Sequence, residues 1–241
     1  MVFLRSALYQ IVFFAWTALL GILGLPLLLG TRRMAMCFGT FWSAGTLAIL
    51  ECCTGLGYEL RGRENLPSGP AIIAMKHQSA CDTFAAPVLF EDAAPVIKRE
   101  LIWLPFYGWY VVKAGAITVD RGAGGRALKR MLGRAALVKD QGRKIIIFPE
   151  GTRTPVGETR IYLPGVAALY QYLELPLVPV AVNSGLFWKR RGFLRRPGNV
   201  LVEILPAIPP GLDRREVMTR LQSEIESATV RLVAEARNKS A

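Results

Sequence analysis

The sequence predicts an α/β fold: a single domain with a central, mostly parallel or mixed sheet flanked by helices, preceded by an apolar two-helix membrane anchor. Two observations predict this fold. From about residue 58 onward, short apolar runs alternate with amphipathic stretches for about 180 residues. Before that point, two long runs contain no charged residue. We therefore divide the chain into an apolar helical hairpin, residues 1–57, and an α/β domain, residues 58–241.

The apolar hairpin comes first along the chain. Its uncharged runs are residues 6–31, long enough to cross a hydrocarbon core of about 30 Å, and residues 34–50, which are marginal. Two full spans would place Arg32 and Arg33 on the non-cytoplasmic side, against the positive-inside tendency. Pro26 also interrupts the first run. We expect a hairpin lodged in one leaflet; the alternatives are true spanning and a buried hairpin of a soluble protein.

The strands and helices of the α/β domain follow in alternation. A strand covered by helices on both faces needs no polar side, so continuous apolar runs predict strands here. We expect strands at residues 71–75, 95–98, 116–120, 144–148, 178–182 and 200–205. The amphipathic stretches predict helices near residues 80–91, 101–113, 124–140, 165–173 and 213–236.

The composition excludes some classes of protein and favours others. Hydrophobic residues make up 52% and charged residues 20%, which excludes a disordered chain. The net charge of +12 indicates contact with an anionic surface, either phospholipid headgroups or nucleic acid. Basic residues interleaved with aromatics in residues 187–196 suit either surface. Because the amino-terminal segment is apolar, we expect a phospholipid membrane as partner and no nucleic acid.

Cysteine and histidine content limits the chemistry further. Cys37, Cys52, Cys53 and Cys81 form no C-x-x-C pairs, so we expect reduced packing residues in a cytosol-facing protein. His77 is the only histidine, which excludes a multi-histidine metal site. We expect no metal.

The first candidate catalytic motif directly follows the strand at residues 71–75. In a continuous helix His77 and Asp82 would point about 140° apart and could not meet. Ser79 is a good N-cap, however, and a helix beginning after it places Asp82 at position N3, facing back over the helix start. The carboxylate can then hold one imidazole nitrogen and leave the other as a base.

The second candidate motif follows the strand at residues 144–148, at the edge where open α/β sheets place ligands. Glu150 adds a carboxylate, and Gly151 allows close approach of the backbone. Thr152 adds a hydroxyl, and Arg153 can grip a phosphate with two parallel hydrogen bonds.

These motifs, with Asp120-Arg121 at one strand end and the apolar strand at residues 178–182, resemble the glycerolipid acyltransferase family of the bacterial 1-acylglycerol-3-phosphate type. The family signature is H-x-x-x-x-D, a G-x-x-F-I-D-R-like block, F-P-E-G-T-R and an apolar V-P-V block. The first and third blocks are intact, and the second keeps only its Asp-Arg end. The resemblance covers roughly residues 58–205.

The resemblance implies a reaction. His77 would act as general base on the free sn-2 hydroxyl of 1-acylglycerol 3-phosphate (lysophosphatidate), oriented by Asp82. The substrate oxygen would attack the acyl thioester and give phosphatidate. The donor would be acyl-CoA or acyl carrier protein as co-substrate, and no cofactor is needed. The enzyme would reside in the cell's inner membrane, with its active site facing the cytoplasm.

The resemblance also implies the binding residues. Glu150 and Gly151 would help to position the glycerol part, and Arg153 would bind its phosphate. Thr152 would also belong to the substrate-binding residues. Lys98 matches another phosphate-binding position of the family, and Arg121 would be a third cation. For the acyl chain, the apolar residues 101–110 are a candidate wall.

Several alternatives remain at this stage. The acceptor could be another lysolipid or glycerol 3-phosphate. A non-catalytic basic membrane or nucleic-acid binding protein would explain the charge but leave His77 and Asp82 without a purpose. Residues 122–127 match the dinucleotide fingerprint G-x-G-x-x-[GA], which fluorescence with a nicotinamide cofactor would test. Cys81 could serve as an acyl-enzyme nucleophile, which full activity of Cys81→Ser would exclude.

Overall fold

The computed structural model describes residues 1–120, 122 and 124–238, which fold around a central sheet. Within these residues the sheet has seven strands in the order β1-β7-β6-β2-β5-β3-β4. All neighbouring strands are parallel except β6 and β7, which are antiparallel. The expected mostly parallel or mixed sheet is therefore confirmed. The strands are β1 (Leu56–Arg61), β2 (Ile72–Met75), β3 (Ala94–Lys98), β4 (Ile117–Val119), β5 (Ile145–Ile147), β6 (Leu177–Val182) and β7 (Gly198–Ile204).

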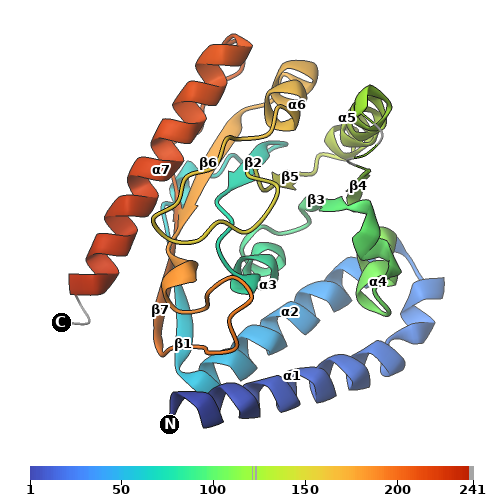
Figure 1. The fold of residues 1–241 in the computed structure, drawn as a ribbon. Coiled ribbons are helices and arrows are strands. Elements are labelled where there is room, and N and C mark those ends of the chain that lie inside the picture. The colour runs from blue at the N-terminus through green and yellow to red at the C-terminus, as the bar shows by residue number, and fades with distance from the viewer. Residues whose placement is uncertain (121, 123, 239–241) are drawn as a thin grey trace.

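Helices cover both faces of the sheet, α1 to α4 on one and α5 to α7 on the other (Figure 1). Along β2, Ile72 and Ala74 belong to the core under α5, α6 and α7, while Ile73 and Met75 belong to the core under α2 and α3. This alternation explains why the strand is apolar throughout. The helices are α1 (Val2–Leu23), α2 (Arg32–Thr54), α3 (Ala80–Leu89), α4 (Tyr107–Lys113), α5 (Gly124–Asp140), α6 (Gly165–Leu173) and α7 (Arg214–Asn238).

The expected helix over residues 101–113 is wrong in its extent. The structure has a short 3-10 helix, Arg99–Trp103, then an irregular turn, and α4 begins only at Tyr107. Pro105 lacks an amide hydrogen and disfavours helical backbone at the residue before it. Phe106 completes the break with a φ of +63°.

Strand β1 was not predicted from the sequence pattern. Helix α2 ends at Thr54, and its C-cap is Gly55, whose φ of +71° is the left-handed conformation typical of a glycine cap. The chain then enters β1, which pairs in parallel with β7 at the edge of the sheet. Tyr58 and Glu59 are exposed there, so the strand lacks the continuous apolar pattern of the central strands. The sheet therefore begins at Leu56, close to the expected domain boundary.

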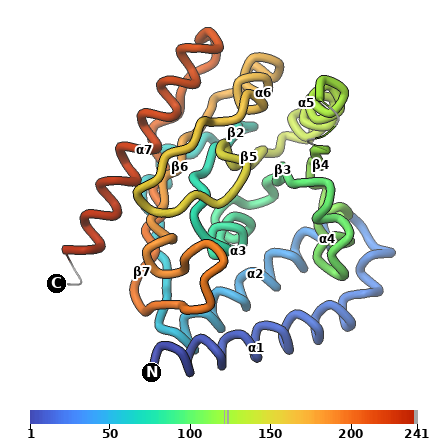
Figure 2. Tube along the Cα trace, viewed as in Figure 1, coloured from blue at the N-terminus to red at the C-terminus, as the bar shows by residue number. Residues whose placement is uncertain are grey.

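The amino-terminal helices form a hairpin that packs along the α/β domain (Figure 2). Both helices are long and apolar enough to cross a membrane by length and composition. Helix α2 lies against α1, α3 and α4, and an added Cβ at Gly45 would stand 2.3 Å from the ring of Trp16 on α1. At the start of α2, Arg32 donates two hydrogen bonds of 2.5 and 2.9 Å to Asp92, which also accepts one of 2.8 Å from Arg143.

The other end of the hairpin is held by Arg195. Its side chain is buried, with the guanidinium carbon 4.4 Å from the ring centroid of Trp188 and 4.9 Å from that of Tyr9. Its amide donates a hydrogen bond of 2.9 Å to the Ser6 hydroxyl. The interpretation of residues 187–196 as a surface for lipid or nucleic acid is therefore wrong for Arg195. A cation stacked on aromatic rings serves here to join α1 to the α/β domain.

Candidate active site

The His77–Asp82 pair forms as the sequence predicts. Ser79 is the N-cap of α3, its hydroxyl accepts from the amide of Cys81, and Asp82 completes a capping box. The Oδ2 atom of Asp82 lies 3.0 Å from Nδ1 of His77 and accepts the amides of Gln78 and Ser79 at 2.7 and 2.8 Å. The positive end of the helix also favours a carboxylate at this position. Because Asp82 engages Nδ1, Nε2 is the nitrogen left to act on a substrate.

The loop after β5 holds His77 from the opposite side. The amide of His77 donates a hydrogen bond of 3.0 Å to Oε2 of Glu150, and its carbonyl accepts one of 2.7 Å from the amide of Thr154. The Phe148 ring stacks on the imidazole with centroids 4.1 Å apart. The imidazole side chain keeps 11% of its surface exposed, so it is enclosed by the protein and still accessible. Backbone and ring are thus both fixed, which is the preorganisation that proton transfer requires.

The turn in this loop depends on Gly151. Its φ is +64°, a conformation that side chains with a Cβ rarely adopt, and its amide donates to the carbonyl of Phe148 at 2.9 Å. The tight turn directs the buried Glu150 carboxylate inward, where Lys76 lies 2.7 Å from Oε1. Glu150 therefore has two protein partners, and its expected contact with the glycerol part stays a prediction. Thr152 is half-buried in the same loop.

The expected phosphate-binding cations lie at this edge of the sheet or outside the described residues. Arg153 is half-buried, and burial lowers the pKa of its guanidinium while the nearby Asp82 carboxylate opposes that shift. Arg190, from the loop after β6, is close enough to lower the pKa of Arg153 further. Lys98 is exposed at the end of β3, the neighbour of β5 in the sheet. Arg121 lies outside the described residues.

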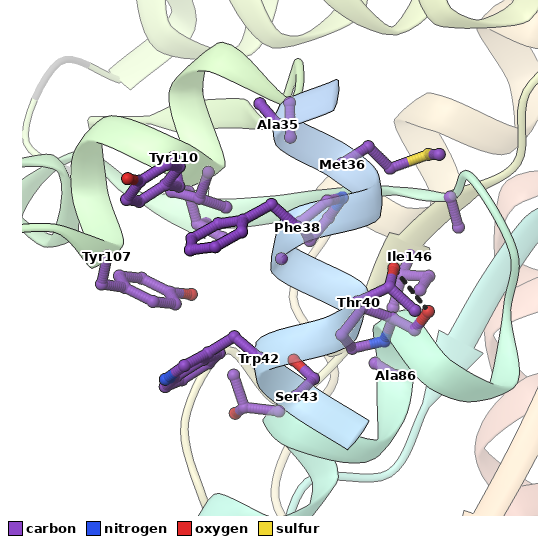
Figure 3. Close-up of a pocket in the computed structure, with 18 of the residues that line it drawn as sticks. Ala35, Met36, Phe38, Thr40, Trp42, Ser43, Ala86, Tyr107, Tyr110 and Ile146 are labelled. Atoms are coloured by element: carbon purple, nitrogen blue, oxygen red, sulfur yellow. Dashed lines mark hydrogen bonds between the residues drawn. The ribbon is translucent and has the colours of Figure 1, made fainter. Parts of the chain in front are cut away.

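An apolar pocket adjoins the ring of Phe148, which stacks on His77. Its volume is about 160 Å³, and it lies between the hairpin and the α/β domain, with Phe148 in its wall. Figure 3 shows Phe38 of α2 pointing toward Tyr110 of α4, with Tyr107 beside them. The ring that stacks on His77 thus also lines a space suited to hydrocarbon. Of the expected wall at residues 101–110, Phe106, Tyr107 and Tyr110 line the pocket, whereas Trp103 is 76% exposed.

Cys81 has the wrong surroundings for a nucleophile. Its side chain is buried, and burial raises the pKa of its thiol well above the ordinary value. A thiol that stays protonated is unreactive, so the Cys81 alternative loses support. Across the residues that the structure describes, no three His, Cys, Asp or Glu side chains gather in a metal-ligand cluster.

Comparison with known proteins shows the family to which this chain belongs. Residues 57–183 match the family model described as Acyltransferase. The chain belongs to the acyltransferase family. The matched segment contains both halves of the site, from His77 to Arg153, as well as residues 122–127. Family membership therefore disfavours the dinucleotide-binding and non-catalytic alternatives.

Relatives of this acyltransferase carry more specific names. It is 34% identical over 194 residues to the 1-acyl-sn-glycerol-3-phosphate acyltransferase of Pseudomonas aeruginosa, covering 80% of this chain and 76% of the relative. It is 32% identical over 165 residues to the enzyme of the same name from Saccharomyces cerevisiae, covering 66% of this chain and 54% of that one. The crystal structure of the Thermotoga maritima 1-acyl-sn-glycerophosphate acyltransferase, PlsC, has the same fold, with a TM-score of 0.78, 18% identity and coverage of 96% and 95% of the two chains.

The structure adds residues to the candidate site that sequence reasoning did not assign. Gln78 accepts the amide of Gly185 at 3.0 Å and so joins the motif after β2 to the segment after β6. Arg190 belongs to the basic run that the sequence does reveal, but its nearness to Arg153 depends on tertiary structure. Lys76 and its partner Glu226 on α7 are separated by 150 positions, and no local pattern predicts their ion pair.

Proposed function

We propose that this acyltransferase moves a fatty acyl group from acyl-CoA or acyl carrier protein to the free sn-2 hydroxyl of 1-acylglycerol 3-phosphate, giving phosphatidate. The single observation that carries the proposal is that the Phe148 ring, which stacks on His77, also lines an apolar pocket, while Arg153 lies close enough to Asp82 to be affected by its charge. The acceptor has the matching parts: a reactive hydroxyl, an acyl chain and a phosphate. The names of the relatives support the same acceptor.

The mechanism follows from the tautomer that Asp82 imposes. With its Nδ1 hydrogen donated to the carboxylate, His77 presents an unprotonated Nε2, which takes the proton of the acceptor hydroxyl. The hydroxyl oxygen then forms a bond to the thioester carbonyl carbon, and the carbon–sulfur bond breaks. The leaving thiolate, whose conjugate acid has a pKa of about 8.5 in comparable thiols, takes the proton from the imidazolium. The histidine returns to its starting state.

A panel of acceptors and donors tests this reaction. Purified protein would be incubated with lysophosphatidate, another lysophospholipid or glycerol 3-phosphate, each with acyl-CoA of several chain lengths or with acyl carrier protein. We expect phosphatidate from lysophosphatidate, identified by mass spectrometry. Acylation confined to a different acceptor would replace the proposed substrate, and no acyl transfer with any pair would contradict the proposal. The donor series would also show which carrier and which chain lengths the enzyme accepts.

The phosphate contact gives a separate prediction. Replacing Arg153 by alanine removes a guanidinium that can bind phosphate with two hydrogen bonds, and a loss of about 2 kcal/mol corresponds to roughly a thirtyfold weaker contact. We expect a rise of that order in the KM for lysophosphatidate with a smaller change in kcat, because the phosphate is held equally before and during the reaction. Steady-state kinetics would measure both constants.

The matched control for Arg153 is Arg160, an exposed arginine in the same loop. Arg160→Ala should leave the KM close to that of the wild type. Equal KM values for Arg153→Ala and the wild type would show that the phosphate is bound elsewhere.

The hairpin, we infer, lies in one leaflet of the membrane, with the α/β domain on the cytoplasmic side. Helix α2 is joined to the α/β domain along its length, from Arg32–Asp92 at its start to β1 after its end. The outer face of α1 exposes large apolar side chains, including Leu8, Ile11 and Phe14. A helix fixed flat against a domain can bury such a face in lipid without spanning.

Vesicle flotation tests the lipid-facing surface. Ile11→Glu with Phe14→Glu should abolish flotation with anionic phospholipid vesicles, because two carboxylates would enter the hydrocarbon. The control is Val230→Glu on the outer face of α7, a residue that is 68% exposed, as is Ile11. It should float like the wild type.

The position of the hairpin turn distinguishes a hairpin in one leaflet from two spanning helices. In intact cells, Leu29→Cys at this turn should resist a membrane-impermeant maleimide added outside. Labelling of Leu29→Cys would support spanning helices instead.

A further inference from the structure

An ion-pair network of Lys76, Glu150 and Glu226 lies next to His77, the proposed base. The Lys76 side chain is 1% exposed, and its ammonium nitrogen is 2.7 Å from Oε1 of Glu150 and 2.6 Å from Oε1 of Glu226. The Tyr162 hydroxyl donates a hydrogen bond of 3.0 Å to the same oxygen of Glu226. A buried ammonium is costly unless it is paired, and the two carboxylates together compensate the charge of Lys76.

The network reaches the reaction centre through Glu150. While Oε1 of Glu150 pairs with Lys76, its Oε2 accepts the amide of His77. Lys76 is also the residue immediately before His77 at the end of β2. The Lys76 ammonium is therefore linked to the His77 backbone through the Glu150 carboxylate.

We propose that Glu226 of α7, acting through Lys76 and Glu150, is a positioning residue for His77. The inference rests on the proposed function, in which His77 is the base. It extends the active site beyond the segment that matches the family model, which ends at residue 183. Glu226 touches no reacting atom. It completes the pairing of Lys76 and thereby fixes the Glu150 carboxylate that holds the His77 amide.

Helix α7 is also held in place by contacts that do not involve Glu226. Arg61 on β1 binds Glu235 with two hydrogen bonds of 2.8 Å each, and Arg231 pairs with Glu203 on β7 at 2.9 Å. Val217, Leu221 and Ile225 are buried in the core beneath α7. A neutral residue at position 226 should therefore leave the helix docked and the protein folded.

The main test is Glu226→Gln in the full-length protein, which preserves shape and removes the charge. We expect kcat to fall roughly 10- to 100-fold, the scale expected when a catalytic group is displaced by a fraction of an ångström to one ångström. The KM values for lysophosphatidate and acyl-CoA should stay within about twofold, since no substrate contact is removed. Glu226→Asp, which keeps the charge, should recover a substantial part of kcat.

The matched control is Glu224→Gln, two positions away on the same helix. Glu224 is half-buried and accepts a hydrogen bond of 2.8 Å from Arg220, one turn earlier on α7. This variant should keep the wild-type kcat and KM. Thermal unfolding of both variants would report any general loss of stability.

A second readout needs no substrate. Because His77 is the only histidine, ¹⁵N-histidine labelling gives the imidazole signals of one residue. We expect Glu226→Gln to shift both ring nitrogens and Glu224→Gln to leave them unchanged. Lower thermal stability with unchanged kcat and unchanged ring signals would show that Glu226 is only structural and would overturn the inference. If the wild type fails to acylate lysophosphatidate, the proposed function fails, and the ring signals still decide whether Glu226 positions His77.

Discussion

Replacing His77 by alanine should lower the turnover of lysophosphatidate at least about 10²-fold, the low end for loss of a general base. That factor corresponds to about 2.7 kcal/mol of transition-state stabilisation. The expectation follows from the geometry: Asp82 occupies Nδ1, and stacking on Phe148 and two backbone hydrogen bonds fix the ring. Phosphatidate formation, followed by mass spectrometry under initial-rate conditions, would measure the effect.

A second variant separates loss of the base from loss of packing. His77→Gln keeps a polar side chain of similar reach beside Asp82 but has no nitrogen that can accept the hydroxyl proton at neutral pH. Both variants should be equally inactive, and the thermal unfolding of His77→Gln should stay closer to that of the wild type. Turnover within a few-fold of the wild type in either variant would remove His77 from the mechanism.

Asp82→Asn should also lower kcat by at least about 10²-fold, because the correct imidazole tautomer would be lost. In the wild type, Oδ2 of Asp82 receives the imidazole and two backbone amides. An asparagine oxygen can still accept hydrogen bonds from the amides of Gln78 and Ser79. It would orient the His77 imidazole less strongly, however, and would place no negative charge beside it. The KM for lysophosphatidate should change little, since the variant alters the base and no phosphate contact.

Asp140 provides the matched control for Asp82. It is an exposed aspartate at the end of α5, so Asp140→Asn should have wild-type kinetics. If Asp82→Asn retained wild-type kcat, the carboxylate would be needed only to cap α3. A large loss of thermal stability with normal turnover per folded molecule would give that conclusion directly.

The contact between His77 and Asp82 was predictable because its geometry is local. The pair and its helix cap, Ser79, are only a few residues apart in the sequence. Because a small polar residue caps a helix, Ser79 fixes the helix start and thereby the direction of the Asp82 carboxylate. The same holds for most strands and helices, whose apolar patterns reflect the faces they bury. The amphipathic pattern predicted one helix over residues 101–113, but Pro105 breaks it. The pattern therefore extended that helix too far.

Other parts of the site were not predictable from sequence. The sequence does not distinguish Arg195 from the other basic residues at positions 187–196. In the structure its guanidinium is buried against Trp188 and Tyr9. The pocket walls come from α1, α2, α3, β3, α4 and the end of β5, and no spacing in the sequence relates these segments to one another. Residue types in such places are compatible with both surface and interior positions, and only packing decides between them.

The sequence by itself determined the chemical groups of the site and their order: an imidazole with a carboxylate at a helix start, and a Pro-Glu-Gly-Thr-Arg turn at a strand end. Short-range backbone geometry is sufficient to fix these, because each depends on only a few consecutive residues. The tertiary structure alone decided that Glu150 faces Lys76 and the His77 amide, and that Glu226 on the last helix completes the network. Those contacts join positions far apart in the chain, and they exist only because packing the helices onto the sheet brings the charges out of water together.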